Sequence, residues 1–238
     1  MKRFLSILAV SILLTNLSFG QGNSSGKKGW IKLSDGKTFT GWHTYGKTDV
    51  SSAWSIDNDG AFHLTGRTPE NKGTRHGGDL VTDEAYENFE LSLEWKISKG
   101  GNSGIIFLVQ DDRAKYQATY ITGPEMQVLD NVDAEDNKLP SHLAGALYDL
   151  IDAKTTSNPK PVGEWNKAEI KLLNGKLELK LNGTVTASVT MWTDEWNQLV
   201  AKSKFATWAD FAKFKSGHIA LQDHGGDVWF RNIKIRKL

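Results

Sequence analysis

The sequence has no cysteine, only five prolines and almost no net charge. Without thiols it forms no disulfide and has no thiolate nucleophile or thiolate metal ligand. Its 29 basic and 28 acidic residues give no electrostatic reason to bind nucleic acid or an anionic membrane. No Gly-rich phosphate loop follows a strand and opens a helix, so we expect no nucleotide cofactor.

The first 20 residues predict a secretory signal peptide. Lys2 and Arg3 precede an apolar stretch, Phe4–Leu17, that is too short to span a bilayer. Small residues at positions 18 and 20 predict cleavage before Gln21. With no cysteine there is no lipoprotein processing site. We therefore expect a periplasmic or secreted protein with no stable membrane anchor; an uncleaved N-terminal anchor is the alternative.

The mature chain predicts one domain. Residues 21–28 are polar and rich in Gly and Ser, and we expect a disordered leader there. Residues 29–238 show no internal repeat and no second linker. A chain of this length can bury a full core, which an exported protein without disulfides needs for its stability.

Strand patterns dominate the domain. Apolar residues alternate with polar ones over Phe89–Ile97, which predicts a half-buried strand. Ser103–Gln110 is more continuously apolar and predicts a central strand. Asn174-Gly175 and Asn182-Gly183 are strong hairpin signals, and they predict a meander of antiparallel strands over residues 165–191.

Helical patterns are scarce. Thr193 followed by two acidic residues predicts the start of a short helix that ends near Lys202, and Thr207–Lys213 suggests a second. About a dozen short strands separated by turn signals predict an all-β fold, a sandwich of two sheets with one or two short helices.

The C-terminal segment predicts two strands joined by Gly225-Gly226. Alternation separates Ile219 and Leu221 from a polar face. We expect that face to form, with residues across the turn, a patch for a small polar ligand, or alternatively an ordinary solvated surface. The patch would comprise His218, Ala220, Gln222 and His224 of the first strand with Trp229 and Arg231 of the second.

Glu125-Met126-Gln127-Val128-Leu129-Asp130 is the second informative segment. In a strand, Glu125 and Gln127 share one face. Retaining glycosidases need two neighbouring carboxylates, and Gln127 cannot ionise, which argues against an ordinary double displacement. Glu125 is a candidate proton acceptor; a structural hydrogen bond is the alternative.

Histidines supply further candidates for proton transfer. Either His142 or His224 can take or give a proton near neutral pH. His43 and His63 are better explained as structural, and His76 lies in a Gly-rich loop that either closes over a ligand or is a plain turn. Acidic residues at 111–112 and 130–136 could offer oxygen ligands to calcium, but their spacing matches no calcium loop.

Several ordered motifs resemble one family. They are GWIKLSDGKTFTGW from Gly29, FELSLEWKISKGGNSGII from Phe89, PEMQVLDN from Pro124, HLAGALYDLI from His142, GEWNKAEI from Gly163 and LQDHGGDVWFRNIKIRKL from Leu221. In this order they resemble the 3-keto-disaccharide hydrolase domain of secreted bacterial proteins, over residues 29–238. The resemblance implies a concanavalin-like jelly roll whose concave sheet binds a small carbohydrate.

The resemblance also implies an activity: cleavage of glycosides whose sugar carries a 3-ketone. Proton abstraction at C2, elimination of the C1 substituent and addition of water would give net hydrolysis, with no cofactor required and calcium or another divalent cation as an option. We expect His142 or Glu125 to be the base and His224 the acid. The expected substrate-binding residues are Asn102, Ser103, Gln127, Tyr148, Gln222, Asp223, Trp229 and Arg231.

Two other functions fit the same sequence. A non-catalytic, lectin-like binding module predicts the same fold and polar face but needs no titrating group. An ordinary glycoside hydrolase acting on unoxidised glycans fits less well, because the second carboxylate is replaced by Gln127.

Overall fold

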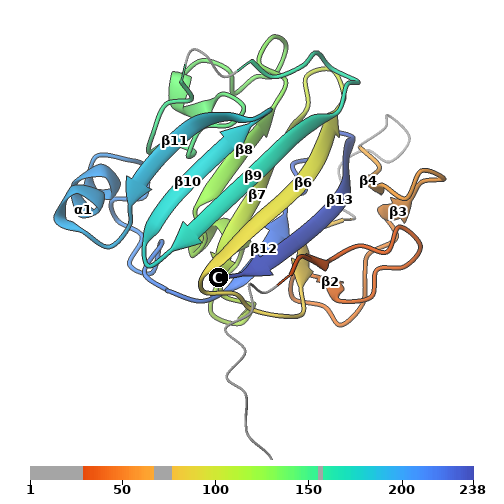
Figure 1. Cartoon of the computed structure of the whole chain (residues 1–238), viewed down its shortest axis with the longest axis horizontal. Coiled ribbons are helices and arrows are strands. Elements are labelled where there is room, and N and C mark those ends of the chain that lie inside the picture. Colours follow the sequence, from red (N-terminus) through yellow and green to blue (C-terminus); the bar gives the residue numbers. More distant parts are fainter. Residues whose placement is uncertain (1–28, 67–76, 155–157) are drawn as a thin grey trace, which may run out of the picture.

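The computed structural model describes residues 29–66, 77–154 and 158–238. Within this part, two antiparallel sheets pack face to face, with the larger sheet in front in Figure 1. This two-sheet jelly-roll sandwich confirms the predicted fold class. The predicted signal peptide, the leader and His76 lie outside the described residues.

The larger sheet has eight strands, and the smaller has five. In spatial order the larger contains β11 (Thr184–Thr190), β10 (Lys176–Leu181), β9 (Asn166–Leu173), β6 (Phe89–Ile97), β13 (Val228–Lys237), β4 (Phe62–Leu64) and β3 (Trp54–Ile56), with β1 (Ile31–Lys32) also paired to β13. The smaller contains β2 (Trp42–Thr44), β5 (Leu80–Thr82), β12 (His218–Leu221), β7 (Asn102–Val109) and β8 (Glu125–Leu129).

Local sequence signals account for much of this architecture. The alternating segment Phe89–Ile97 is β6, as predicted. Both Asn-Gly pairs turn with positive φ, near 50° at Asn174 and Asn182, and they connect β9, β10 and β11 as the predicted meander. These backbone angles suit the tight turns that match the twist of the flanking strands.

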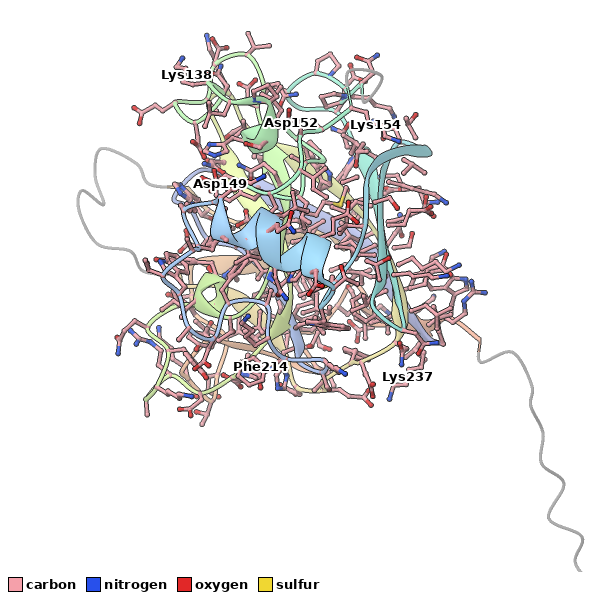
Figure 2. The ribbon with its side chains drawn as sticks, turned by 90° about the vertical axis from the view of Figure 1, so that its left-hand side faces the viewer. Lys138, Asp149, Asp152, Lys154, Phe214 and Lys237 are labelled. Carbon is pink, nitrogen blue, oxygen red and sulfur yellow. The ribbon has the colours of Figure 1, made fainter. Side chains whose placement is uncertain are left out.

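One α-helix forms in the described part of the chain. It is α1 (Asp194–Ala201), and the hydroxyl of Thr193 caps it by accepting a hydrogen bond from the Trp196 amide at 3.2 Å. Trp196 is buried, and α1 lies beside β11, in front of the sheets in Figure 2. Two short 3-10 helices, η2 (Thr119–Ile121) and η3 (Pro140–His142), lie in loops.

The second helix predicted over Thr207–Lys213 is wrong. This segment forms successive turns, and Ala212 has a left-handed φ of 53° that interrupts a helix. Phe211 stacks on Phe205 with ring centroids 3.8 Å apart. Aromatic packing onto the domain therefore determines the backbone here, in place of local helix propensity.

The predicted polar patch across Gly225-Gly226 is also wrong. The turn carries the chain from one sheet to the other, since β12 pairs with β5 and β7 while β13 pairs with β6 and β4. Apolar residues explain this crossover. Leu221 of β12 and Phe230 of β13 are both fully buried in the core between the sheets.

One face of the smaller sheet packs against the main core, and the opposite face points away from it. Ile219 and Leu221 join the main core, whereas Ala220 belongs to a small separate cluster with Val81 and Ile106. The predicted alternation along β12 is therefore confirmed.

Among the described residues, no helix is both long enough and apolar enough to cross a membrane.

Candidate active site

A cavity of about 610 Å³ opens on the outer face of the five-stranded sheet. Its floor comprises Asn102 of β7, Glu125 and Gln127 of β8, and Gln222 just after β12. These strands are hydrogen-bonded neighbours, with Gly104 opposite Gln127 and the Gln222 amide donating to the Gly104 carbonyl at 3.0 Å. Residues distant in sequence thus meet on one rigid surface.

Glu125 is an acid of this surface with a strongly raised pKa. Its side chain is almost fully buried, with 8% exposed, and burial raises its pKa to about 8. Asp79 and Asp136 raise the pKa further, and the cation of Lys204 opposes them. A carboxyl group with this pKa can accept or release a proton near neutral pH.

Glycine makes room for this carboxyl group. The side chain of Glu125 lies over Gly104, and a Cβ at that position would overlap the carboxyl oxygen. Any residue larger than glycine at position 104 would therefore displace the Glu125 carboxylate. The close approach places Glu125 flat against the sheet, which also explains its burial.

Two glutamine side chains line the cavity together with Glu125, and each has a carbonyl oxygen that accepts no hydrogen bond from a described residue. Gln127 and Gln222 are 1% and 7% exposed, and their Oε1 atoms have no hydrogen-bond partner within the described part of the chain. A buried carbonyl oxygen without a partner is costly, so such atoms call for explanation. Hydroxyl groups of a bound sugar would supply the missing donors.

A chain of polar contacts holds the next wall. The Tyr148 hydroxyl donates to Asp136 Oδ2 at 2.9 Å, and His142 lies between two carboxylates, with Nδ1 2.7 Å from Asp136 Oδ1 and Nε2 3.1 Å from Asp149 Oδ1. The Lys204 amide donates to the other oxygen of Asp149 at 2.7 Å. Burial is the largest cause that raises the pKa of Tyr148, which keeps the phenol protonated.

His142 itself does not line the cavity, although Asp136 and Tyr148 do. Its ring lies against Tyr148 with centroids 4.4 Å apart. The structure therefore places this predicted base behind the cavity wall, where it positions Asp136 and Tyr148.

The loop after α1 closes one side of the cavity. Lys204 Nζ lies 4.0 Å from the centroid of the Tyr148 ring, and Phe205 and Trp208 also line the cavity. The nearby cation favours negative charge on Glu125 or on a bound ligand.

The opposite wall is organised around Asp223. Its carboxylate accepts the Gly78 amide at 2.8 Å and the Gly225 amide at 2.9 Å, and its own amide donates to Asp79 at 2.9 Å. His224 follows it and lines the cavity. Asp223 thereby fixes the loop that presents His224.

Most of the predicted site residues meet in this cavity, and some do not. Those lining it are Asn102, Glu125, Gln127, Tyr148, Gln222, Asp223 and His224. Ser103 points to the other side of its strand, where its hydroxyl donates to the Gln222 carbonyl at 2.8 Å. Trp229 and Arg231 belong to β13 in the eight-stranded sheet, because the chain crosses between sheets after β12.

Sequence reasoning missed several lining residues. Lys204 and Trp208 lie in the segment around the wrongly predicted second helix, and Arg113 and Tyr120 lie in a loop without a recognisable motif. The sequence suggests Asp136 only as a calcium ligand. A long aromatic-rich loop after a short helix was the one signal that could have pointed to Lys204 and Trp208.

The predicted calcium ligands have protein partners. Asp111 lies 2.8 Å from His43, and Asp130 accepts the Gly100 and Val132 amides at 2.8 and 3.0 Å. Among the described residues, no group of three or more His, Cys, Asp or Glu side chains is placed to hold a metal ion. Metal dependence stays a prediction to be tested.

Comparison with known proteins gives consistent relatives. Residues 29–236 match the model of the 3-keto-α-glucoside-1,2-lyase-like domain. A 3-keto-disaccharide hydrolase of Bacteroides thetaiotaomicron VPI-5482 is 40% identical over 230 residues, covering 88% of this chain and 79% of the relative. A crystal structure of a candidate glycosyl hydrolase from Parabacteroides distasonis ATCC 8503 is 31% identical, with a TM-score of 0.78 and coverages of 88% and 94%.

Proposed function

Because the chain belongs to the family of 3-keto-α-glucoside-1,2-lyase-like domains, we propose that it is an exported enzyme that cleaves 3-keto-glycosides. The relatives' names support a carbohydrate-active hydrolase as the broader class. The proposal of export rests on residues 1–20, which lie outside the described part. The single observation that carries the chemistry is the buried Glu125 carboxyl group with a pKa of about 8.

A 3-ketone makes the hydrogen at C2 acidic. Glu125 in its ionised form takes that proton, and the electron pair forms an enolate across C2 and C3. The C1–O bond then breaks, which leaves a double bond between C1 and C2. A carboxylate whose pKa is raised is a stronger base than an ordinary one, so burial of Glu125 favours this first step.

The developing charges have nearby partners. The cation of Lys204, which already interacts with Glu125, faces the enolate oxygen and stabilises it. His224 gives a proton to the departing oxygen, and Gln127 and Gln222 accept hydrogen bonds from sugar hydroxyls. Water then adds to C1 and gives its other proton to His224, and Glu125, whose proton has exchanged with solvent, protonates C2, so the sum of the steps is hydrolysis.

His142 acts as a positioning residue in this scheme. It fixes Asp136, which in turn accepts the Tyr148 hydroxyl at the cavity wall. Replacing His142 should therefore raise KM or lower kcat through misplacement of Tyr148, without removing the ionisation of Glu125 from the pH profile.

The test is incubation of the mature protein with a 3-keto-glucoside and with its unoxidised parent. We expect sugar release from the ketone at least about 10³-fold faster, because the parent has no acidic C2 hydrogen. In deuterated water the released sugar should carry deuterium at C2. Retention of the original C2 hydrogen in every product molecule would exclude elimination, and equal rates on both substrates would exclude the need for a ketone.

A further inference from the structure

The described residues that line the cavity include both acids and cations. Their carboxyl groups are those of Asp79, Glu125, Asp136 and Asp223. Asp79, Asp136 and Asp223 accept hydrogen bonds from protein groups, whereas Glu125 lies buried over Gly104. Lys204 is close enough to Glu125 for its charge to lower the pKa of that carboxyl group, and its Nζ lies 4.0 Å from the centroid of the Tyr148 ring. Among the described lining residues, Lys47 and Arg113 are two further cations, and they come from different loops.

Arg113 is held in place without a carboxylate. A Cβ at Gly46, where φ is 73°, would lie 2.9 Å from Arg113 Cδ, so the aliphatic part of Arg113 packs directly on the Gly46 backbone. One guanidinium nitrogen donates to the amide oxygen of Gln117. Within the described residues, no carboxylate lies within ion-pair distance of Arg113 or of Lys47.

The acids next to Arg113 in sequence have other partners. Asp111 lies 2.8 Å from His43 Nε2, and Asp112 accepts the Lys115 amide at 3.1 Å. A guanidinium that is fixed at its stem and at one nitrogen keeps its remaining donors in a defined direction. Such a group is suited to bind the oxygens of a carboxylate, sulfate or phosphate.

Aromatic side chains connect the loop of Arg113 with the loop that carries Lys204. Tyr120, on the same loop as Arg113, is 40% exposed and lies against Trp208 with ring centroids 6.0 Å apart. Because the oxidised sugar must lie over Glu125 on the floor, the part of the ligand that reaches these loops is the leaving group. Aromatic faces and fixed cations together fit a flat or cyclic group that carries negative charge.

We propose that Arg113, with Lys47 beside it, binds an anionic group on the leaving-group portion of the substrate. This inference rests on the proposed function for the direction in which the substrate lies. It predicts a preference for glycosides with a charged leaving group over otherwise matched neutral ones. The preference should weaken with salt, because the cations are exposed and a Debye length of about 8 Å at physiological ionic strength screens them.

The test compares phenyl and 4-carboxyphenyl 3-keto-glucosides, in both anomers, at low ionic strength. For the anomer that reacts, wild-type protein should show a kcat/KM about tenfold higher for the carboxyphenyl compound. Arg113→Gln should reduce this ratio to below threefold, with the ratio of the two compounds as the readout. Lys47→Gln should reduce the ratio by a smaller factor, and Lys171→Gln, on the exposed surface of β9, is the matched control.

A binding measurement separates this inference from the proposed activity. Dissociation constants of the unoxidised phenyl and 4-carboxyphenyl glucosides are measured by calorimetry for wild type and Arg113→Gln. A preference for the anion that Arg113→Gln removes supports the inference even where neither 3-keto compound is cleaved. Equal affinities and equal kcat/KM values in the wild type overturn it, as does a preference that survives in Arg113→Gln.

Discussion

The two outer faces of the sandwich carry similar residues arranged differently. On the eight-stranded sheet, Trp229 stacks on His63 at 4.4 Å, and its indole nitrogen donates to Asp57. Arg231 lies over Trp165 at 3.9 Å and pairs with Glu94 at 2.8 Å. On the five-stranded sheet, by contrast, the buried Oε1 atoms of Gln127 and Gln222 have no hydrogen-bond partner among the described residues. The eight-stranded sheet also has unpartnered buried atoms, Trp95 Nε1 and Arg236 Nε, but both are donors, and the Arg236 guanidinium is paired with Glu90 through another nitrogen.

This difference separates a structural surface from a binding surface. Where each ring, cation and carboxylate already has a partner, a ligand would have to break contacts before making new ones. Where buried acceptors are left over, a ligand supplies what the fold does not. Residue type alone does not distinguish the two faces, because both combine Trp, His, Arg or Lys with carboxylates.

The sharpest test of the comparison replaces one carboxylate by an amide on each face, in two separate variants. Glu125→Gln should lower kcat on a 3-keto-glucoside by about 10²- to 10⁴-fold, the range expected for loss of one acid–base group. Glu94→Gln, which removes the partner of Arg231 on the opposite face, should stay within threefold of wild type. Comparable losses in both variants would contradict the assignment of the cavity as the site.

The pH dependence should identify the role of Glu125. As a base it must be ionised, so in a His224→Gln variant, which removes the other titrating group of the proposed mechanism, kcat/KM should rise about tenfold per pH unit below 8 and level off above it. An activity that instead declines through pH 8 would make Glu125 the acid. The His142→Asn variant provides the control, since it should shift KM or kcat and keep this profile.

The Glu125 carboxyl group should also make the folded protein less stable as the pH rises. The folded pKa of Glu125, about 8, exceeds the ordinary value of 4.5, so the folded protein binds its proton more tightly than the unfolded chain does. Stability should therefore fall as pH rises from about 4.5 to about 8. Urea unfolding of Glu125→Gln should show a smaller fall over this range and a more stable protein at pH 8.

Gly104 offers a test that leaves every polar group in place. In Gly104→Ala the added methyl group displaces the Glu125 carboxyl, and we expect kcat to fall by about tenfold or more because small misplacements of reacting groups are costly. Gly29→Ala is the control, because nothing lies within 4 Å of a Cβ there. Wild-type kcat in a folded Gly104→Ala protein would mean that the position of Glu125 is unimportant.

The smallest expected effect lies on the eight-stranded face. Arg231→Gln should change kcat/KM by less than threefold and lower the free energy of unfolding by up to about 1 kcal/mol, as is usual for a partly exposed ion pair. A loss of activity of 100-fold with unchanged stability would restore Arg231 to the site predicted from its sequence neighbourhood.

Sequence reasoning succeeded where signals are local. Alternation over Phe89–Ile97 and the Asn-Gly turns specify their strands and hairpins because backbone preferences act within a few residues. Alternation also placed Glu125 and Gln127 together on one face, where both line the cavity.

Sequence reasoning failed to predict which of the two sheets each strand joins. The turn at Gly225-Gly226 has the same composition whether it joins neighbouring strands or crosses the core, so Trp229 was assigned to the wrong surface. Lys204 and Arg113 reach the cavity from loops whose course is determined by packing at long range. No local pattern encodes that course.

The position of β13 has a consequence for how the molecule assembles. This last strand of the chain lies between β6 and β4 in the middle of the eight-stranded sheet, and it also pairs with β1. While a ribosome is still synthesising residues 228–237, β6 lacks one neighbour, and the pair β3–β4 is separated from the other strands of its sheet. The sheet can close only after translation of this strand, so we expect folding to begin late and to proceed slowly through contacts between distant segments.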